Sequence, residues 1–328
     1  MNAQEELKRQ IFSLENEEDF RKVTLEVFRF QAKNNKTYRN YLELLKINAT
    51  LIERISDIPF LPIDFFKSEE IISVNKKPEL YFESSGTTAQ TKSRHYISDP
   101  DLYRQSLLNG FQLVYGNPAD YVFLALLPSY MENPHSSLIF MVNVLMEASG
   151  SLLNGYFKND YEALSERIKT CHQQNLKFFL WGIPYALLDL AAKYDISIGN
   201  ENIILETGGM KGRGKEIVRE ELHTLLKEKF STTNIHSEYG MTELLSQGYT
   251  VDGTNFKSPP WMRVWIRDVY DPFQYASHGQ TGAINVIDLA NLYSCSFIAT
   301  EDLGRASDGT FEVLGRLEYA DIRGCNML

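Results

Sequence analysis

The chain has 328 residues, and its 33 lysines and arginines against 43 aspartates and glutamates give a formal net charge of −10. This acidic balance argues against a protein whose main role is to coat nucleic acid or an anionic membrane. With 43% hydrophobic and 23% charged residues, the composition is that of a folded globular protein rather than a disordered one.

The cysteines and the apolar runs exclude further classes. Cys171, Cys295 and Cys325 are too few and too scattered for a disulfide framework or a zinc site. No apolar run approaches the roughly 18 residues of a membrane span, and residues 1–10 are too polar for a signal peptide. We therefore expect a cytoplasmic enzyme without membrane insertion and without a nucleic-acid partner.

Residues 1–80 are expected to form a helical segment packed on the core. Leu7, Ile11 and Leu14 recur at helical spacing between charged residues. Two prolines within residues 58–63 then favour an extended stretch, because proline fixes its own backbone and restricts the residue before it.

Short apolar runs alternate with amphipathic helices in the expected α/β core, residues 81–248. Strands are expected at residues 121–127, 177–181, 202–205 and 234–237. Helices are expected at residues 136–148, 161–174, 183–194 and 215–230. This alternation predicts a largely parallel sheet with helices on both faces.

Residues 249–328 are expected to form a β-rich subdomain that completes the nucleotide site. The helical signal fades there, and short apolar runs are joined by turns rich in glycine and aspartate. The expected strands are residues 263–266, 282–289, 297–300 and 310–314.

The sharpest chemical signal is the loop SSGTTAQTK, residues 84–92. Backbone N–H groups and hydroxyls can surround a polyphosphate, and Lys92 adds a positive charge. The spacing of a Walker loop is absent. A solvent-exposed turn rich in serine and threonine is the structural alternative.

Three further motifs follow in the chain. In EYGMTE, residues 238–243, a ring can stack on a base, a hydroxyl can contact phosphate and a carboxylate can bind Mg²⁺. ATEDLGR, residues 299–305, supplies an acid for a ribose diol, and GRLE follows at residues 315–318.

These four motifs, in this order, resemble the core motifs of the adenylate-forming superfamily, which includes acyl-CoA synthetases, luciferases and peptide-synthetase adenylation domains. Ala89 and Thr91 replace a glycine and a proline of the family's phosphate loop, and Glu301 replaces the glycine of its Thr-Gly-Asp. The resemblance implies an α/β fold, the large domain of these enzymes, with layered α/β subdomains and a small β-rich subdomain. We expect the C-terminal lid domain, which supplies a catalytic lysine, to be absent.

Within the superfamily, the sequence resembles the LuxE-like acyl-protein synthetases at residues 58–62, at Phe66-Lys67, at residues 300–305 and at residues 315–325. That group activates a fatty acid as acyl-AMP with ATP and Mg²⁺, releasing pyrophosphate, and then transfers the acyl group to a cysteine near its own C-terminus. The resemblance places this thioester on Cys325. An incidental tail cysteine is the alternative.

The resemblance also assigns roles to individual residues. The phosphates are assigned to Ser84, Ser85, Gly86, Thr87, Thr88 and the catalytic Lys92. The rest of the nucleotide is assigned to Gly208, Gly209, Tyr239, Gly240, Thr242, Asp302 and Arg316, and the metal to Glu243. His135 is placed near the acyl carboxylate; the alternative is a histidine bonded to backbone at a helix start. For the two glycines the alternative is a plain strand-to-helix turn.

Two other functions remain open. The first is a ligase that passes the acyl group to coenzyme A or to a carrier protein. The second is a catalytically silent partner subunit that keeps the nucleotide fold. The expected partners are therefore a carboxylic acid and an acyl-accepting protein, a reductase or a carrier protein.

Overall fold

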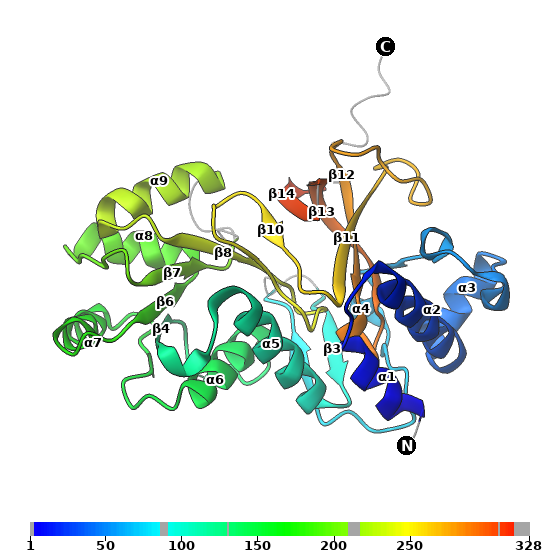
Figure 1. Ribbon diagram of the computed structural model, residues 1–328, viewed down its shortest axis with the longest axis horizontal. Coiled ribbons are helices and arrows are strands. Elements are labelled where there is room, and N and C mark those ends of the chain that lie inside the picture. Colours follow the sequence, from blue (N-terminus) through cyan, green and yellow to red (C-terminus); the bar gives the residue numbers. More distant parts are fainter. Residues whose placement is uncertain (1–2, 86–90, 130, 209–216, 308, 318–328) are drawn as a thin grey trace, which may run out of the picture. The chain divides into compact units, whose positions relative to one another are not determined.

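The computed structural model describes residues 3–85, 91–129, 131–208, 217–307 and 309–317. The chain divides into two compact units, which Figure 1 shows as one ribbon coloured along the sequence. The first unit comprises Met1–Tyr103, Glu243–Ser246 and Lys257–Leu328, and the second comprises Arg104–Thr242 and Gln247–Phe256. The expected segments 1–80, 81–248 and 249–328 do not coincide with these units, because the N-terminal helices pack with the C-terminal strands.

The first unit combines N-terminal helices with mostly antiparallel strands. Its helices are α1 (Ala3–Ile11), α2 (Glu17–Asn34), α3 (Lys36–Leu44), α4 (Phe65–Ser68) and the short 3₁₀ turns η1 (Ala49–Leu51), η2 (Ile55–Asp57) and η4 (Leu289–Asn291). Its strands are β1 (Leu61–Pro62), β2 (Leu80–Glu83), β3 (Arg94–Ile97), β11 (Met262–Arg267), β12 (Gly282–Asp288), β13 (Phe297–Ser307) and β14 (Thr310–Arg316).

The second unit alternates strands and helices. Its helices are α5 (Pro100–Tyr115, which starts before the unit boundary), η3 (Pro118–Asp120), α6 (Ser137–Ser149), α7 (Tyr161–Gln173), α8 (Pro184–Lys193) and α9 (Arg219–Phe230). Its strands are β4 (Val122–Leu126), β5 (Gly155–Tyr156), β6 (Phe178–Gly182), β7 (Ile203–Glu206), β8 (Ile235–Tyr239) and β9 (Gly248–Thr250), and β10 (Phe256–Lys257) spans the boundary in the sequence. Among the described residues, no helix has the length and apolarity needed to cross a membrane.

The β-rich part of the first unit is an antiparallel sheet in the order β11-β12-β13-β14, and β1 pairs in parallel with β13. The four strands expected after residue 249 are therefore confirmed. Two of them are longer than the sequence indicates, because β13 and β14 continue to a tight turn that pairs Ser307 with Thr310.

A buried glutamine joins α2 to the C-terminal segment. The Gln31 side-chain amide donates to the carbonyl oxygens of Asn291 and Leu292 at 2.9 and 3.0 Å. Its own oxygen accepts from the backbone N–H of Ser296 at 2.9 Å. Because these backbone groups are buried and need partners, the glutamine specifies how the helical segment docks on the strands.

The sheet of the second unit runs β9-β8-β7-β6-β4-β5. Neighbouring strands pair in parallel from β5 through β4, β6 and β7 to β8. Strand β9 pairs antiparallel with β8. Adjacent residues of β8 face opposite sides: His236 stacks on Tyr115 of α5, and Ser237 lies against His223 of α9. Helices therefore cover both faces (Figure 1), and the expected α/β class is confirmed.

One expected helix starts later than its pattern indicates. Val218 is the N-cap of α9 and is 70% exposed, so the helix begins at Arg219 rather than at residue 215. Leu222 and Leu226 are buried, and His223 shares their inward face. The helical spacing is right, but a polar residue occupies one of the inward positions.

We expect Gln31→Leu to lower the free energy of unfolding by about 2–4 kcal/mol, because a leucine removes the buried hydrogen bonds to the Leu292 carbonyl and the Ser296 N–H and leaves the Asn291 carbonyl with the Ser294 N–H. Urea unfolding followed by circular dichroism measures the change. Gln112→Leu, at an exposed position of α5, is the matched control, with an expected change within about 0.5 kcal/mol. Equal effects of the two substitutions would contradict the docking role.

Candidate nucleotide site

The two strands that flank the loop of residues 84–92 pair with each other. Strands β2 and β3 pair antiparallel from Leu80↔Ile97 to Glu83↔Arg94. Ser84 and Ser93 extend this pairing, since the Ser84 N–H donates to the Ser93 carbonyl at 3.1 Å and the Ser93 N–H donates to the Ser84 hydroxyl at 3.0 Å. The sequence analysis did not predict this hairpin.

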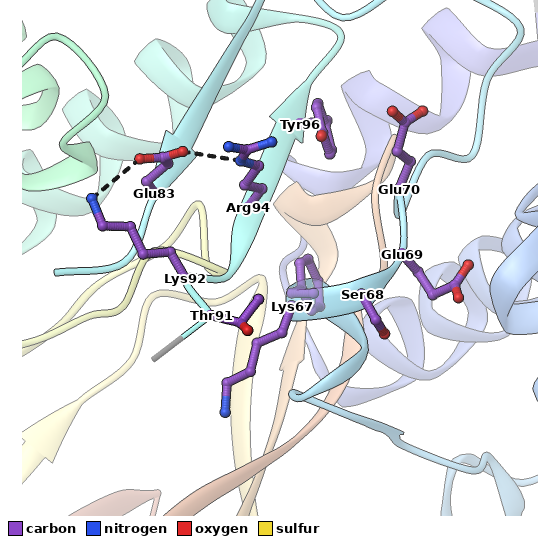
Figure 2. Close-up of a pocket in the computed structure, with 10 residues that line it drawn as sticks. Lys67, Ser68, Glu69, Glu70, Glu83, Thr91, Lys92, Arg94 and Tyr96 are labelled. Carbon is purple, nitrogen blue, oxygen red and sulfur yellow. Dashed lines mark hydrogen bonds and ion pairs between the residues drawn. The ribbon is translucent and has the colours of Figure 1, made fainter. Parts of the chain in front are cut away.

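Glu83 sits at the base of the loop between two cations, as Figure 2 shows. Its carboxylate accepts from Lys92 Nζ at 3.4 Å and from Arg94 Nε at 3.0 Å. Partial burial acts to raise the pKa of Glu83, but the hydrogen bonds from Arg94 and Lys92 hold it below its ordinary value. The three side chains line a cavity of about 620 Å³ together with Lys67 and Tyr96. Lys92 is half-exposed, and exposed ion pairs such as this one contribute little to stability.

Glu243 is buried beside the end of the same loop. The Ser93 hydroxyl donates to Glu243 Oε1, and Asn291 Nδ2 donates to the Glu243 carbonyl at 2.8 Å. Burial raises the pKa of Glu243, the Ser93 hydrogen bond and Arg316 oppose that rise, and the charge of Asp302 adds to it. A cation would therefore favour the ionised form of this carboxyl.

The residues around Glu243 fit a magnesium ion that is completed by ligand and water oxygens. Among the described residues, no group of three or more His, Cys, Asp or Glu could by itself hold a metal ion. Mg²⁺ commonly takes one or two protein carboxylates together with substrate phosphates and waters. Glu243, with the negative charge of Asp302 nearby, matches that requirement.

Asp302 and Arg316 are directly opposite one another on β13 and β14. Arg316 Nε donates to Asp302 Oδ1 at 3.3 Å, and the side chains are 79% and 12% exposed, respectively. Thr300 accepts from the Asp302 N–H at 3.1 Å, which orders the strand at this point. The antiparallel register therefore brings two of the expected nucleotide residues together.

The second unit holds the other expected nucleotide residues. Tyr239 ends β8, is buried, and meets the ring of Phe256 edge-on with 6.0 Å between centroids. A Cβ at Gly240 would lie 2.4 Å from Glu238 Oε1, so any other residue there would require the Glu238 side chain to move. Thr242 is half-buried.

Two further expected residues follow strands of the second unit. Gly208 follows β7 with φ +67°, a conformation that favours glycine. His135 is half-buried in the turn before Ser136, the residue that caps α6.

Several expected site residues lie outside the described residues: Gly86, Thr87, Thr88, Gly209 and Cys325. Ser85 is exposed where the described part of the loop ends. The other cysteines, Cys171 and Cys295, are buried, and burial raises the pKa of Cys295 to about 12. They are core thiols.

The second unit contains a buried polar cluster that no sequence motif includes. Glu206 is 1% exposed at the end of β7, where its carboxylate accepts from Ser237 of β8 and contacts His223 Nε2 of α9 at 3.4 Å. His223 uses the same nitrogen for Ser237, at 3.1 Å, so the acid does not orient the far side of the ring as a hydrolase triad requires. The sequence did contain a signal for this cluster, because Glu206 directly follows the apolar strand expected at residues 202–205. A glutamate is almost never fully buried unless it is paired.

Comparison with known proteins supports the expected resemblance. Residues 8–105 match the family model for acyl-protein synthetase, LuxE. Over 327 residues the chain is 24% identical to the long-chain-fatty-acid–luciferin-component ligase of Vibrio harveyi, covering 91% of this chain and 84% of the relative. A protein of the same name from Photorhabdus luminescens is 35% identical over 74 residues, which cover 22% of this chain and 63% of that one.

Solved structures share the fold. A 2-hydroxyisobutyryl-CoA ligase in an open conformation superposes with a TM-score of 0.70 at 11% identity, covering 92% of this chain and 70% of that chain. ATP-bound MatB from Rhodopseudomonas palustris gives 0.56 at 17% identity, covering 81% of this chain and 49% of that chain. The fold is thus that of the adenylate-forming enzymes.

Within that class the sequence similarity is to the LuxE acyl-protein synthetases, as the family model and both bacterial relatives indicate. The resemblance expected from the four motifs is confirmed.

Glu238 gives the site a pH-dependent stability. Burial raises its pKa to about 8, and the charge of Glu206 adds to the shift. The ordinary value is 4.5, so between these two values the folded state binds a proton that the unfolded state has lost. Stability therefore falls as the pH rises through that window.

We expect Glu238→Gln to match the wild type near pH 5 and to be more stable by about 2–5 kcal/mol near pH 8.5, because glutamine mimics the protonated acid. Urea unfolding at both pH values measures the difference. Glu228→Gln, at an exposed position of α9, is the control. A stability difference that does not change with pH would show that Glu238 does not hold this proton.

Proposed function

We propose that this chain is an ATP-dependent ligase that activates a carboxylic acid as acyl-AMP, releases pyrophosphate and transfers the acyl group to a protein thiol. The observation that carries the proposal is the hydrogen bond between Ser93 and Glu243. It joins the end of the phosphate loop to the last residue of the Tyr-Gly-x-Thr-Glu motif, two segments that the resemblance assigns to one nucleotide.

In the first step a carboxylate oxygen of the acid attacks the α-phosphorus of ATP, and the bond to the pyrophosphate oxygen breaks. Catalysis of this step is mainly positioning and charge neutralisation. Lys92 and the loop hydroxyls hold the β- and γ-phosphates, Thr242 the α-phosphate and Asp302 the ribose hydroxyls. Glu243 holds Mg²⁺, which supplies positive charge to the phosphate oxygens when bound.

The remaining assigned residues bind the ends of the substrates. Tyr239 and the Gly208 backbone flank adenine, and Arg316 contacts a ribose or phosphate oxygen. His135 orients the carboxylate of the acid. The names of the two bacterial relatives support a long-chain fatty acid as the substrate class.

In the second step the thiolate of Cys325 attacks the acyl carbonyl carbon, and the bond to the AMP oxygen breaks. A thioester forms and AMP leaves. Arg323 precedes the cysteine by two residues, and a neighbouring cation raises the thiolate fraction. The thioester retains enough reactivity for onward transfer to a protein partner such as a reductase.

We expect the wild type to release pyrophosphate when mixed with ATP, Mg²⁺ and fatty acids, and Glu243→Gln to reduce that rate roughly 100-fold by weakening charge stabilisation. A coupled pyrophosphate assay measures the rate, and thermal unfolding checks that the variant is folded. Glu53→Gln, an exposed substitution, should leave the rate unchanged. Absence of pyrophosphate release from the wild type with every acid would favour the silent partner subunit.

We expect intact-protein mass spectrometry to show an acyl adduct after incubation with ATP, Mg²⁺ and a fatty acid, and hydroxylamine to remove it. Cys325→Ser should abolish the adduct while pyrophosphate release persists, because only the second step needs the thiol. An adduct that survives the substitution would place the acyl group elsewhere. Turnover that requires added coenzyme A or carrier protein would favour the alternative ligase.

A further inference from the structure

A buried carboxylate holds the turn that follows β7. Gly208 donates its backbone N–H to Glu206 Oε2 at 2.6 Å. This bond crosses the turn at Thr207, where the chain leaves the sheet, and Gly208 itself has a positive φ. The conformation of the turn therefore depends on a side chain that no motif includes.

The other oxygen of the same carboxylate faces two secondary-structure elements. Ser237 of β8 donates its hydroxyl to Glu206 Oε1, and His223 Nε2 and Arg219 Nε of α9 lie 3.4 and 3.7 Å away. Burial acts to raise the pKa of Glu206, but the hydrogen bonds from His223, Ser237 and Gly208, together with the charge of Arg219, hold it below its ordinary value. The group is a carboxylate anion that links β7, β8 and α9.

The contacts continue from Arg219 to the tyrosine of the nucleotide motif. The Arg219 guanidinium lies over the ring of Phe256, 4.8 Å from its centroid. That ring meets Tyr239 edge-on, with 6.0 Å between centroids. A continuous set of contacts thus runs from the Gly208 turn through Glu206, Arg219 and Phe256 to Tyr239.

Stability alone does not explain the choice of a charged residue here. Burying an ion pair is expensive, and well-packed apolar residues of similar volume are often equally stabilising or more so. An apolar residue would not bind the Gly208 N–H. His223 is also closely confined, since a Cβ at Gly253 would lie 2.7 Å from its Nδ1.

We propose that Glu206 is a positioning residue for the nucleoside end of the nucleotide: it fixes the Gly208 turn and, through Arg219 and Phe256, sets the place of Tyr239. This inference rests on the proposed function, in which Gly208 and Tyr239 flank adenine. Glu206 contacts no substrate itself. It aligns two elements whose separation determines how well a purine fits between them.

The test compares two ligands that use different parts of the nucleotide site. Isothermal titration calorimetry of the full chain measures binding of AMP, which carries the nucleoside, and of Mg²⁺-pyrophosphate, which does not. We expect Glu206→Gln to weaken AMP binding roughly tenfold, the effect of losing one charge-assisted hydrogen bond, and to leave pyrophosphate binding unchanged. Glu201→Gln, an exposed substitution just before β7, should alter neither affinity.

Hydrogen–deuterium exchange of the peptide spanning residues 203–208 gives a second readout that needs no ligand. We expect faster exchange in Glu206→Gln, because the acceptor of the Gly208 N–H is weakened. If Glu206→Gln does not fold, Arg219→Leu takes its place, with the same expected loss of AMP affinity. Retained pyrophosphate binding shows that either variant is folded.

The outcomes separate the two proposals. A wild type that binds neither AMP nor ATP would overturn the proposed function, and the exchange measurement would still decide whether Glu206 holds the turn. Unchanged AMP affinity and unchanged exchange in Glu206→Gln would overturn the positioning role. Equal losses of AMP and pyrophosphate affinity in both Glu206→Gln and Arg219→Leu would overturn it too, since the contacts would then support the structure in general and not the nucleoside end.

Discussion

The hydrogen bond from Ser93 to Glu243 joins two segments of the first unit that are 150 positions apart in the sequence. A buried carboxyl needs such partners, because leaving it without them costs several kcal/mol. The residues that follow Glu243 are also hydrogen-bonded: Asp288 accepts from the N–H groups of Leu245 and Ser246 at 2.8 and 2.9 Å. The end of β12 thereby fixes the segment that carries Glu243, and the hairpin of the phosphate loop is fixed to Glu243.

The pKa values of three buried glutamates shift in different directions because their surroundings differ. Glu206 receives hydrogen bonds from His223, Ser237 and a backbone N–H, which hold its pKa below the ordinary value despite burial. Glu238, with burial and the Glu206 charge acting in the same direction, has its pKa raised to about 8. Glu243 has Ser93 as a donor, yet burial keeps its pKa raised.

Local patterns in the sequence were sufficient for most of the alternating strands and helices of the second unit and for the four strands after residue 249, but not for the β2–β3 hairpin. The strands of the second unit are short apolar runs separated by helical spacing, so their parallel pairing followed from alternation alone. Long-range contacts were not visible in this way. Nothing local indicates that Gln31 caps backbone groups near residue 291, although both segments belong to the first unit. His223 was missed for a related reason, since its inward position on α9 matters only because Glu206 and Ser237 face it.

The cysteines narrow the choice of acyl acceptor. Nucleophilic attack on an acyl-AMP requires a thiolate that the acyl group can reach. Burial raises the pKa of both Cys171 and Cys295, and both side chains are enclosed in the core, where a long acyl chain has no access. The sequence contains three cysteines, so self-acylation on sulfur leads to Cys325. If Cys325 is not acylated, the thiol that receives the acyl group must belong to another molecule, and the question becomes which partner this ligase serves.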